Sequence, residues 1–229
     1  MLSRLSELQA SPRYKKREAQ LWSKLDMALT GLNAEKLPDR MTAMRSLRSE
    51  SVRELGLLRY PVRQWFVARC GALVSHIRAE LDTALTAELL RTTVFLWDRY
   101  ITHPLWAECH GDGAEAIVRP VLAELTDDLA DAPAAAIREK IASLMAKLGD
   151  TRAWDIYGDT LPKRTAEMSW LFINVINCGD SITAEQAERL ITVLEKIILK
   201  TRNPSTKGYA ERAAAALRDK HRRPSHPLP

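Results

Sequence analysis

The 229 residues are 46% hydrophobic and 28% charged, and the net charge of +5 divides into +7 over residues 1–80, −9 over 81–195 and +7 over 196–229. These proportions exclude an intrinsically disordered chain, and no apolar run reaches the roughly 18 residues that cross a bilayer. Because the three cysteines lie far apart and the first residues lack the apolar core of a secretory signal, we expect a soluble cytoplasmic protein.

Apolar residues recur at steps of three and four residues along most of the chain, which predicts α-helices. In the first half we expect a short helix that ends at Ser11-Pro12, followed by helices over about 13–32, 41–58, 62–81 and 89–101. Tyr60-Pro61 ends one of these helices because the residue before a proline is pushed out of the helical conformation. The clearest predicted loop is His110-Gly-Asp-Gly113.

In the second half we expect helices over about 117–129, 133–148, 183–198 and 207–220, whereas residues 151–161 are ambiguous. Gly149 is expected just beyond the end of one helix, and Thr183 and Gln186 have the spacing of a capping box at the start of another. The run 170–176 is rich in aromatic and β-branched residues, but its spacing and the lack of a partner strand favour a buried helix. The tail 221–229 is expected to be disordered and basic.

We therefore predict an all-α protein, an irregular bundle of about nine or ten helices that could include stacked helical hairpins. Residues 1–220 are expected to form a single helical domain. This domain could divide between residues 82 and 113 into a basic N-terminal and an acidic C-terminal part. No repeat of roughly 30–45 residues aligns the tryptophans, prolines and leucines, so the sequence gives no support to a solenoid.

The densest group of potential metal ligands and nucleophiles lies between His103 and Asp112 and includes Cys109 and His110. On a helix these two adjacent side chains would diverge by about 100°, and no second cluster completes a four-ligand site. The chain also has no phosphate-binding glycine loop and no other known catalytic motif. We therefore predict a protein that is not an enzyme and uses no cofactor or metal, with a small hydrolase or metalloenzyme at 103–112 as a third hypothesis.

The basic segments give the strongest indication of function. One tight cluster stands at the head of the helix over 13–32, and residues 40–69 contain arginine but no lysine, which matters because a guanidinium fork suits phosphate. Within 40–69 only Glu50 and Glu54 could pair with these arginines, so we expect most of them to lack a mate. The candidate nucleic-acid-binding residues are Arg13, Lys15, Lys16, Arg17, Arg40, Arg45, Arg48, Arg53, Arg59, Arg63, Arg69, Lys200, Arg202 and Lys207.

Such patches suit a grip on the nucleic-acid backbone that does not depend on base sequence. The first hypothesis is a non-enzymatic protein that binds DNA or RNA, alone or in a nucleoprotein assembly, with the acidic middle as a protein-contact surface. The alternative is a helical adaptor or regulator that self-associates or binds an acidic protein without nucleic acid. Each basic cluster could also be an ordinary solvated helix face. Among the tryptophans, Trp22, Trp65 and Trp97 are assigned to the core, and Trp106 and Trp154 are the candidates for a surface.

Overall fold

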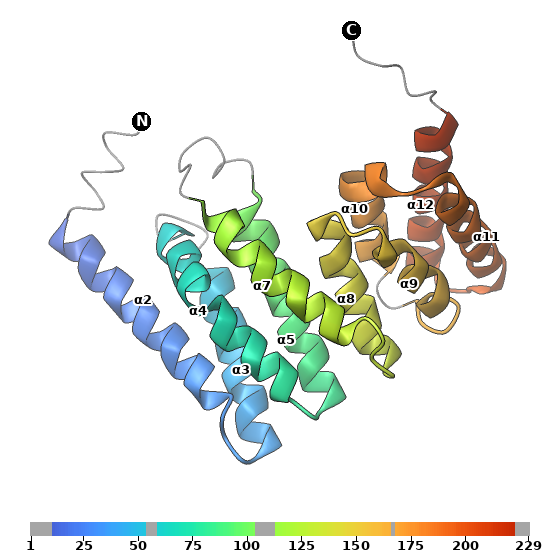
Figure 1. The fold of residues 1–229 in the computed structure, drawn as a ribbon. Helices are drawn as coiled ribbons and strands as arrows, with labels where there is room; N and C mark the ends of the chain where they lie inside the picture. Colours follow the sequence, from blue (N-terminus) through green and yellow to red (C-terminus); the bar gives the residue numbers. More distant parts are fainter. Residues whose placement is uncertain (1–10, 54–58, 104–112, 166–167, 223–229) are drawn as a thin grey trace, which may run out of the picture. The chain divides into compact units, whose positions relative to one another are not determined.

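A computed structural model describes residues 11–53, 59–103, 113–165 and 168–222. Within these ranges the structure contains ten α-helices, one π-helical turn and one 3-10 turn, and no strand (Figure 1). The all-α prediction is therefore confirmed. The chain divides into two compact units, Met1–Val121 and Leu122–Pro229, and the division lies inside a helix.

The first unit is built from two helical hairpins. One hairpin consists of α2 (Pro12–Gly31) and α3 (Leu37–Arg53), and the other of α4 (Arg59–Ala79) and α5 (Thr83–Leu96). The hairpins pack side by side, because α2 contacts α4 and α3 contacts α5 (Figure 1). The π-helical turn η1 (Trp97–Ile101) continues α5 and packs against α4.

Short polar residues fix where the helices of this unit begin. The Ser11 side chain accepts a hydrogen bond from the Tyr14 backbone N–H at 3.2 Å, and Pro12 follows it as the first helical residue. Asp82 caps α5 in the same way through the Leu85 N–H at 2.8 Å. Each cap satisfies a backbone donor that has no partner inside its helix. Ser11 thus begins a helix, and the short helix predicted before it lies outside the described residues.

Large aromatic side chains fill the core of the first unit. Trp65, Phe66, Trp97 and Tyr100 are fully buried, which confirms the core assignment of the two tryptophans. Trp22 is half-buried, and its ring Nε1–H donates to the Pro61 carbonyl at 3.1 Å. Burial of such large rings supplies much of the hydrophobic stabilisation of a unit of this size.

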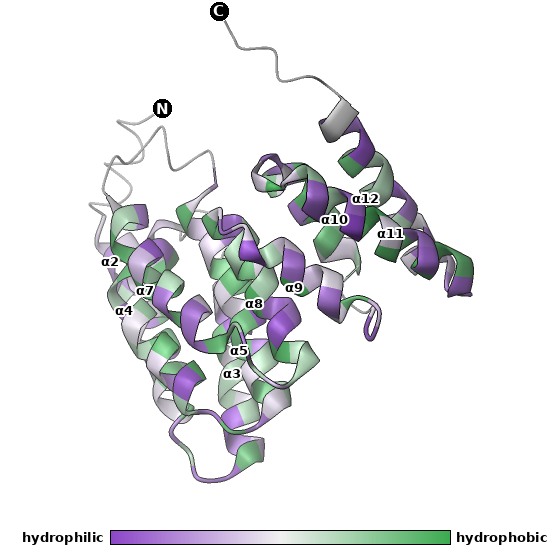
Figure 2. Cartoon of the chain, turned by 45° about the vertical axis from the view of Figure 1, so that its right-hand side comes forward, coloured by the Kyte–Doolittle hydropathy of each residue, from purple (hydrophilic) through white to green (hydrophobic). Residues whose placement is uncertain are grey.

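The second unit begins within α7 (Ala114–Leu129), which crosses the division. Helices α8 and α9 form one hairpin and α11 and α12 another, while α10 packs against both α8 and α12. Hydrophobic and hydrophilic residues alternate along α11 and α12, as expected for amphipathic helices (Figure 2). The helices are α8 (Ala135–Leu148), α9 (Arg152–Thr160), α10 (Met168–Cys178), α11 (Ala184–Lys200) and α12 (Pro204–Arg222), with the 3-10 turn η2 (Gly179–Ser181) between α10 and α11.

Several local predictions for this unit are confirmed. Thr183 and Gln186 form the capping box of α11, and Gly149 ends α8 with a left-handed φ of +79°. Residues 168–178 form a helix, not a strand. The expectation that Trp154 is a surface residue is wrong, because this ring is only 1% exposed and its Nε1–H donates to the Ser181 hydroxyl at 3.1 Å. Trp106 lies outside the described residues.

Candidate nucleic-acid interface

Two arginines of α3 pair with acidic residues that lie about 40 positions further along the chain. The Arg40 guanidinium holds Glu80 with two hydrogen bonds, Nε to Oε2 at 2.8 Å and Nη2 to Oε1 at 3.0 Å. Arg48 Nη1 donates to Glu88 Oε2 at 3.0 Å. The prediction that most arginines of residues 40–69 lack a mate is wrong for this pair, because their partners come from the neighbouring hairpin.

Arg69 of α4 is engaged by a carboxylate of α2. Its Nε lies 3.0 Å from Asp26 Oδ1, and the buried Trp65 donates its ring N–H to the same oxygen at 2.9 Å. The hydrogen bond from Arg69 is the main cause that lowers the pKa of Asp26 below its ordinary value. This network joins the two hairpins. The nearby Asp26 carboxylate also reduces the positive potential that Arg69 presents to a ligand.

Arg63 is a core residue. Its side chain is buried, and Nη1 donates to the backbone carbonyls of Tyr100 and Ile101 at the end of η1. It therefore satisfies carbonyls that a helix end leaves without partners. The prediction that Arg63 binds phosphate at the surface is therefore wrong.

The remaining arginines of this stretch differ from one another. Arg45 is exposed on α3 and makes no hydrogen bond or ion pair within the described part of the chain. The side chains of Arg53 and Arg59 are outside the described residues. The stretch 40–69 therefore offers a ligand far fewer cations than its composition indicates.

The head of α2 presents a different picture. Four cations, here called the α2 cluster, are exposed and have no hydrogen bond or ion pair to any residue that the structure describes: Arg13, Lys15, Lys16 and Arg17. The first turn of α2 holds no acidic residue. A helix N-terminus carries a partial positive charge, so these side chains add to a positive potential. Side chains Arg13 and Arg17, four positions apart, also repel each other.

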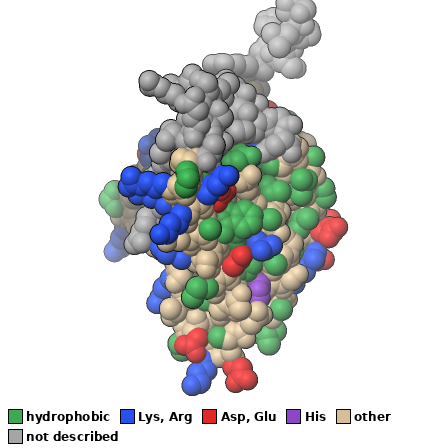
Figure 3. All heavy atoms as spheres, turned by 90° about the vertical axis from the view of Figure 1, so that its left-hand side faces the viewer, with side chains coloured by type: hydrophobic (Ala, Val, Ile, Leu, Met, Phe, Trp, Pro, Cys, Tyr) green, Lys and Arg blue, Asp and Glu red, His purple; other side chains and the backbone are tan. Residues whose placement is uncertain are grey.

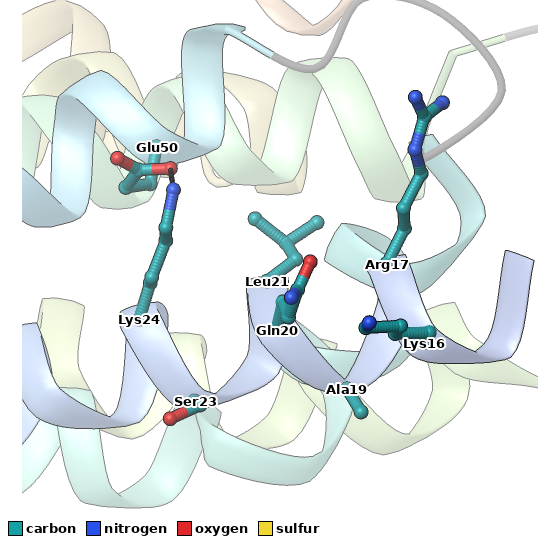
Figure 4. A pocket seen from close by; sticks show the side chains of 8 residues that line it. All are labelled: Lys16, Arg17, Ala19, Gln20, Leu21, Ser23, Lys24 and Glu50. Atoms are coloured by element: carbon teal, nitrogen blue, oxygen red, sulfur yellow. Dashed lines mark hydrogen bonds and ion pairs between the residues drawn. The ribbon is translucent and has the colours of Figure 1, made fainter. Parts of the chain in front are cut away.

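An open hollow of about 920 Å³ lies beside the α2 cluster, between α2 and α3. Lys16, Arg17 and Lys24 line it together with Glu50, and Lys24 Nζ lies 3.5 Å from Glu50 Oε2. Arg17 and Lys24 extend from α2 on the side of α3 (Figure 4). Figure 3 looks onto the side of the molecule that carries α2, where cationic side chains gather in the upper part.

A second set of exposed cations lies where α11 passes into α12. This hairpin cluster also makes no hydrogen bond or ion pair within the described ranges, and it consists of Lys196, Lys200, Arg202 and Lys207. Three other basic residues of α12, whose side chains are described, are engaged: Arg212, Arg218 and Lys220. Arg218 Nη2 contacts Glu195 Oε1 at 2.5 Å, and Lys220 Nζ contacts Asp180 Oδ1 at 2.8 Å. Arg212 lies over the rings of Phe172 and Tyr209 at 5.1 and 4.5 Å from their centres.

The alternative chemistries find little in the described residues. No group of three or more histidine, cysteine or carboxylate side chains is arranged to hold a metal there. Of the segment His103–Asp112 only His103 is described, so that segment's hypothesis stays a prediction. Asp127 lies in an ion pair with Arg152 at 2.5 Å on the surface of the second unit. Burial raises the pKa of the Cys70 thiol to about 12, so it is protonated and unreactive at neutral pH.

Among the described helices, none has the length and apolar content that a bilayer crossing needs. No protein-family model, no curated protein and no solved structure matches the chain.

Proposed function

We propose that this protein is a non-enzymatic nucleic-acid-binding protein, acting alone or within a nucleoprotein assembly, that grips the phosphate backbone through the α2 cluster and the hairpin cluster. The observation that carries the proposal is the α2 cluster itself: four exposed cations within five residues and no partner for any of them in the described chain. Phosphate contacts of this kind supply most of the affinity of binding that is independent of base sequence.

The contrast between the α2 cluster and the arginines of α3 and α4 supports this proposal. Arg40, Arg48 and Arg69 pair with carboxylates of the same unit. The α2 cluster has no such partners, although like charges on one helix and cations at its N-terminus each cost a few tenths of a kcal/mol. A bound phosphate backbone would remove this repulsion, and the energy so gained would add to the affinity.

The test is a fluorescence-anisotropy titration of the full chain with a labelled 20-nucleotide single strand, a 20-base-pair DNA duplex and a single-stranded RNA. We expect binding at 50 mM salt that weakens at least tenfold at 200 mM. The triple variant K15Q/K16Q/R17Q should bind at least tenfold more weakly at 50 mM salt. Absence of binding to all three probes at 50 mM salt would overturn the proposal and leave the acidic-protein adaptor as the hypothesis.

The matched control is Arg48→Gln, which also removes a cation but one that is paired with Glu88. It should leave the affinity within about twofold of the wild type, since the loss of one screened charge changes binding little. A loss of log affinity per removed charge that is as large in this single variant as in the triple variant would show that net charge, and not the α2 cluster, determines binding.

A further inference from the structure

A hollow of about 540 Å³ in the second unit is lined by polar side chains from the segment before α10, from α10 and from the start of α12. Its volume falls within the range of about 300–1,000 Å³ that is typical of small-molecule sites. One guanidinium, four hydroxyls and a phenol converge on it: Arg164, Thr165, Ser169, Ser205, Thr206 and Tyr209.

The four hydroxyls of this hollow make no hydrogen bond to any residue in the described part of the chain. Helical hydroxyls elsewhere in the second unit behave differently. Thr126, Thr160 and Thr192 each donate to a backbone carbonyl of the preceding turn, at 2.7, 2.8 and 3.0 Å. The hollow therefore gathers donors that the fold itself does not use.

A buried carboxylate holds the guanidinium of this hollow in place. Arg164 Nε donates to Glu139 Oε2 at 3.3 Å, and the Glu139 side chain is 1% exposed. The two Nη groups of Arg164 make no hydrogen bond within the described residues. The main-chain donors at the start of α12 are already taken, because Asn203 Oδ1 accepts from the N–H groups of Ser205 and Thr206 at 3.0 and 3.2 Å. The available donors are thus side chains.

We propose that this hollow binds a phosphate monoester, as carried by a nucleoside 5′-monophosphate or by the phosphorylated end of a strand. The Arg164 fork would hold two oxygens, and the hydroxyls would donate to the third. The ring of Tyr209 also lines the hollow, and Arg212 lies over this ring at 4.5 Å from its centre. This inference does not rest on the proposed backbone grip.

The test is a calorimetric titration of the full chain with AMP, adenosine and inorganic phosphate at 50 mM salt. We expect AMP to bind, phosphate to compete with it, and adenosine to give no heat, because the phosphate supplies the contacts. A second arm compares a 5′-phosphorylated oligonucleotide with its 5′-hydroxyl form. If the protein binds the 5′-phosphorylated oligonucleotide more tightly than its 5′-hydroxyl form but does not bind AMP, the ligand is a strand end. No binding of AMP or phosphate at millimolar concentration, together with no discrimination between the two oligonucleotides, would overturn the proposal.

Four variants assign any binding to the hollow. Thr206→Val and Ser169→Ala each remove one unused hydroxyl, and each should weaken AMP at least threefold with an unchanged melting temperature. Thr192→Val is the matched control, since its hydroxyl donates to Glu188 on α11 outside the hollow. The K15Q/K16Q/R17Q variant should bind AMP as the wild type does. If that variant loses AMP binding while Thr206→Val and Ser169→Ala bind AMP as the wild type does, the phosphate binds at α2 and the proposal is overturned.

Discussion

Arg63 shows how an arginine of a basic stretch can belong to the core. Its buried guanidinium donates to the carbonyls of Tyr100 and Ile101. Replacement by methionine keeps an unbranched apolar stem but leaves these acceptors buried without donors, which costs about 2–3 kcal/mol. We therefore predict that Arg63→Met lowers the free energy of unfolding by that amount in urea titrations followed by circular dichroism.

Arg45→Met is the control for this substitution, because Arg45 is exposed on α3 and has no partner among the described residues. It should change the free energy of unfolding by less than about 0.5 kcal/mol. If both variants are equally stable, the buried hydrogen bonds of Arg63 contribute nothing, and the assignment of this residue to the core network is wrong.

The contribution of Asp26 to the free energy of unfolding depends on pH. Its folded-state pKa is lowered, chiefly by the hydrogen bond from Arg69, so between the lowered value and the ordinary one the unfolded chain binds more protons. The contribution is complete above pH about 4 and is lost as the pH falls through the folded-state pKa. Since both side chains are over one-third exposed, we discount it to about 0.5–1 kcal/mol at pH 7.

Asp26→Asn keeps an acceptor for the Trp65 ring N–H and removes the charge that faces Arg69. We predict that this variant is less stable than the wild type at pH 7 and that the difference becomes smaller as the pH falls below about 4. Urea titrations at pH 7, 4 and 2.5 measure it. A difference that stays constant over this range would mean that the hydrogen-bond geometry, and not the charge of Asp26, stabilises the network.

At the scale of elements, two ion pairs join α3 to the second hairpin. Arg40 pairs with Glu80 in the link between α4 and α5, and Arg48 pairs with Glu88 on α5, and the two pairs differ in burial. The Glu80 side chain is 6% exposed and accepts both hydrogen bonds from Arg40, whereas Glu88 is 32% exposed and meets Arg48 through one. Removing one partner of a buried pair costs more than removing one of an exposed pair. We predict that Glu80→Gln lowers the free energy of unfolding by about 1–2 kcal/mol and Glu88→Gln by less than about 0.5 kcal/mol.

Thermal and urea unfolding of the two glutamine variants, with the double variant as a check, measure this difference. The two sites share no partner, so the effects should add within about 0.5 kcal/mol. Equal effects of the two single substitutions would show that burial of Glu80 does not strengthen its pair with Arg40.

Local elements could be predicted from the sequence, but the stacking of the hairpins could not. The capping box of Thr183 and Gln186 and the left-handed Gly149 depend on residues close together in the chain, and both were found. The hairpins recur at a longer spacing, since α4 begins 47 residues after α2 and α5 begins 46 residues after α3. A search for repeats of roughly 30–45 residues misses this spacing. A core also tolerates the exchange of one apolar residue for another of similar volume, so two hairpins can pack in the same way without sharing identical residues.

The candidate site was overestimated for the same reason. Within residues 40–69 only Glu50 and Glu54 are acidic, yet the mates of Arg40, Arg48 and Arg69 are Glu80, Glu88 and Asp26, outside that stretch. A sequence read alone gives charge by position and does not give the contacts between helices that neutralise it. Where basic residues are dense and acids are scarce in the sequence, as in the α2 cluster, the cations are exposed.

At the scale of the whole chain, the basic and acidic thirds neutralise each other in part within each unit. Acidic residues of 81–195 take up Arg48 in the first unit and Arg218 and Lys220 in the second. The formal charges of the segments therefore overstate what a partner would meet. The exposed cations without partners in the described residues include one cluster in each unit, four at α2 and four at the turn from α11 to α12, besides single ones such as Arg45.

Two such clusters make a quantitative prediction about salt. For a DNA duplex, log K falls with log salt by about 0.9 for each phosphate that the protein neutralises. If both clusters contact the backbone, K15Q/K16Q/R17Q and K200Q/R202Q/K207Q should each reduce the magnitude of this slope by about 2–3, and their combination by the sum. Anisotropy titrations at four salt concentrations between 50 and 200 mM measure the slopes.

The control is Arg218→Gln, whose cation is already paired with Glu195 and should leave the slope unchanged. A slope that changes in only one triple variant would mean that one unit binds the duplex and that the other cluster is a solvated helix face. A slope that changes in neither, with binding retained, would place the phosphate contacts on other residues and remove both clusters from the proposed interface. Because the slope counts phosphate contacts independently of affinity, it separates the loss of a contact from a general loss of stability, which affinity measured at a single salt concentration does not.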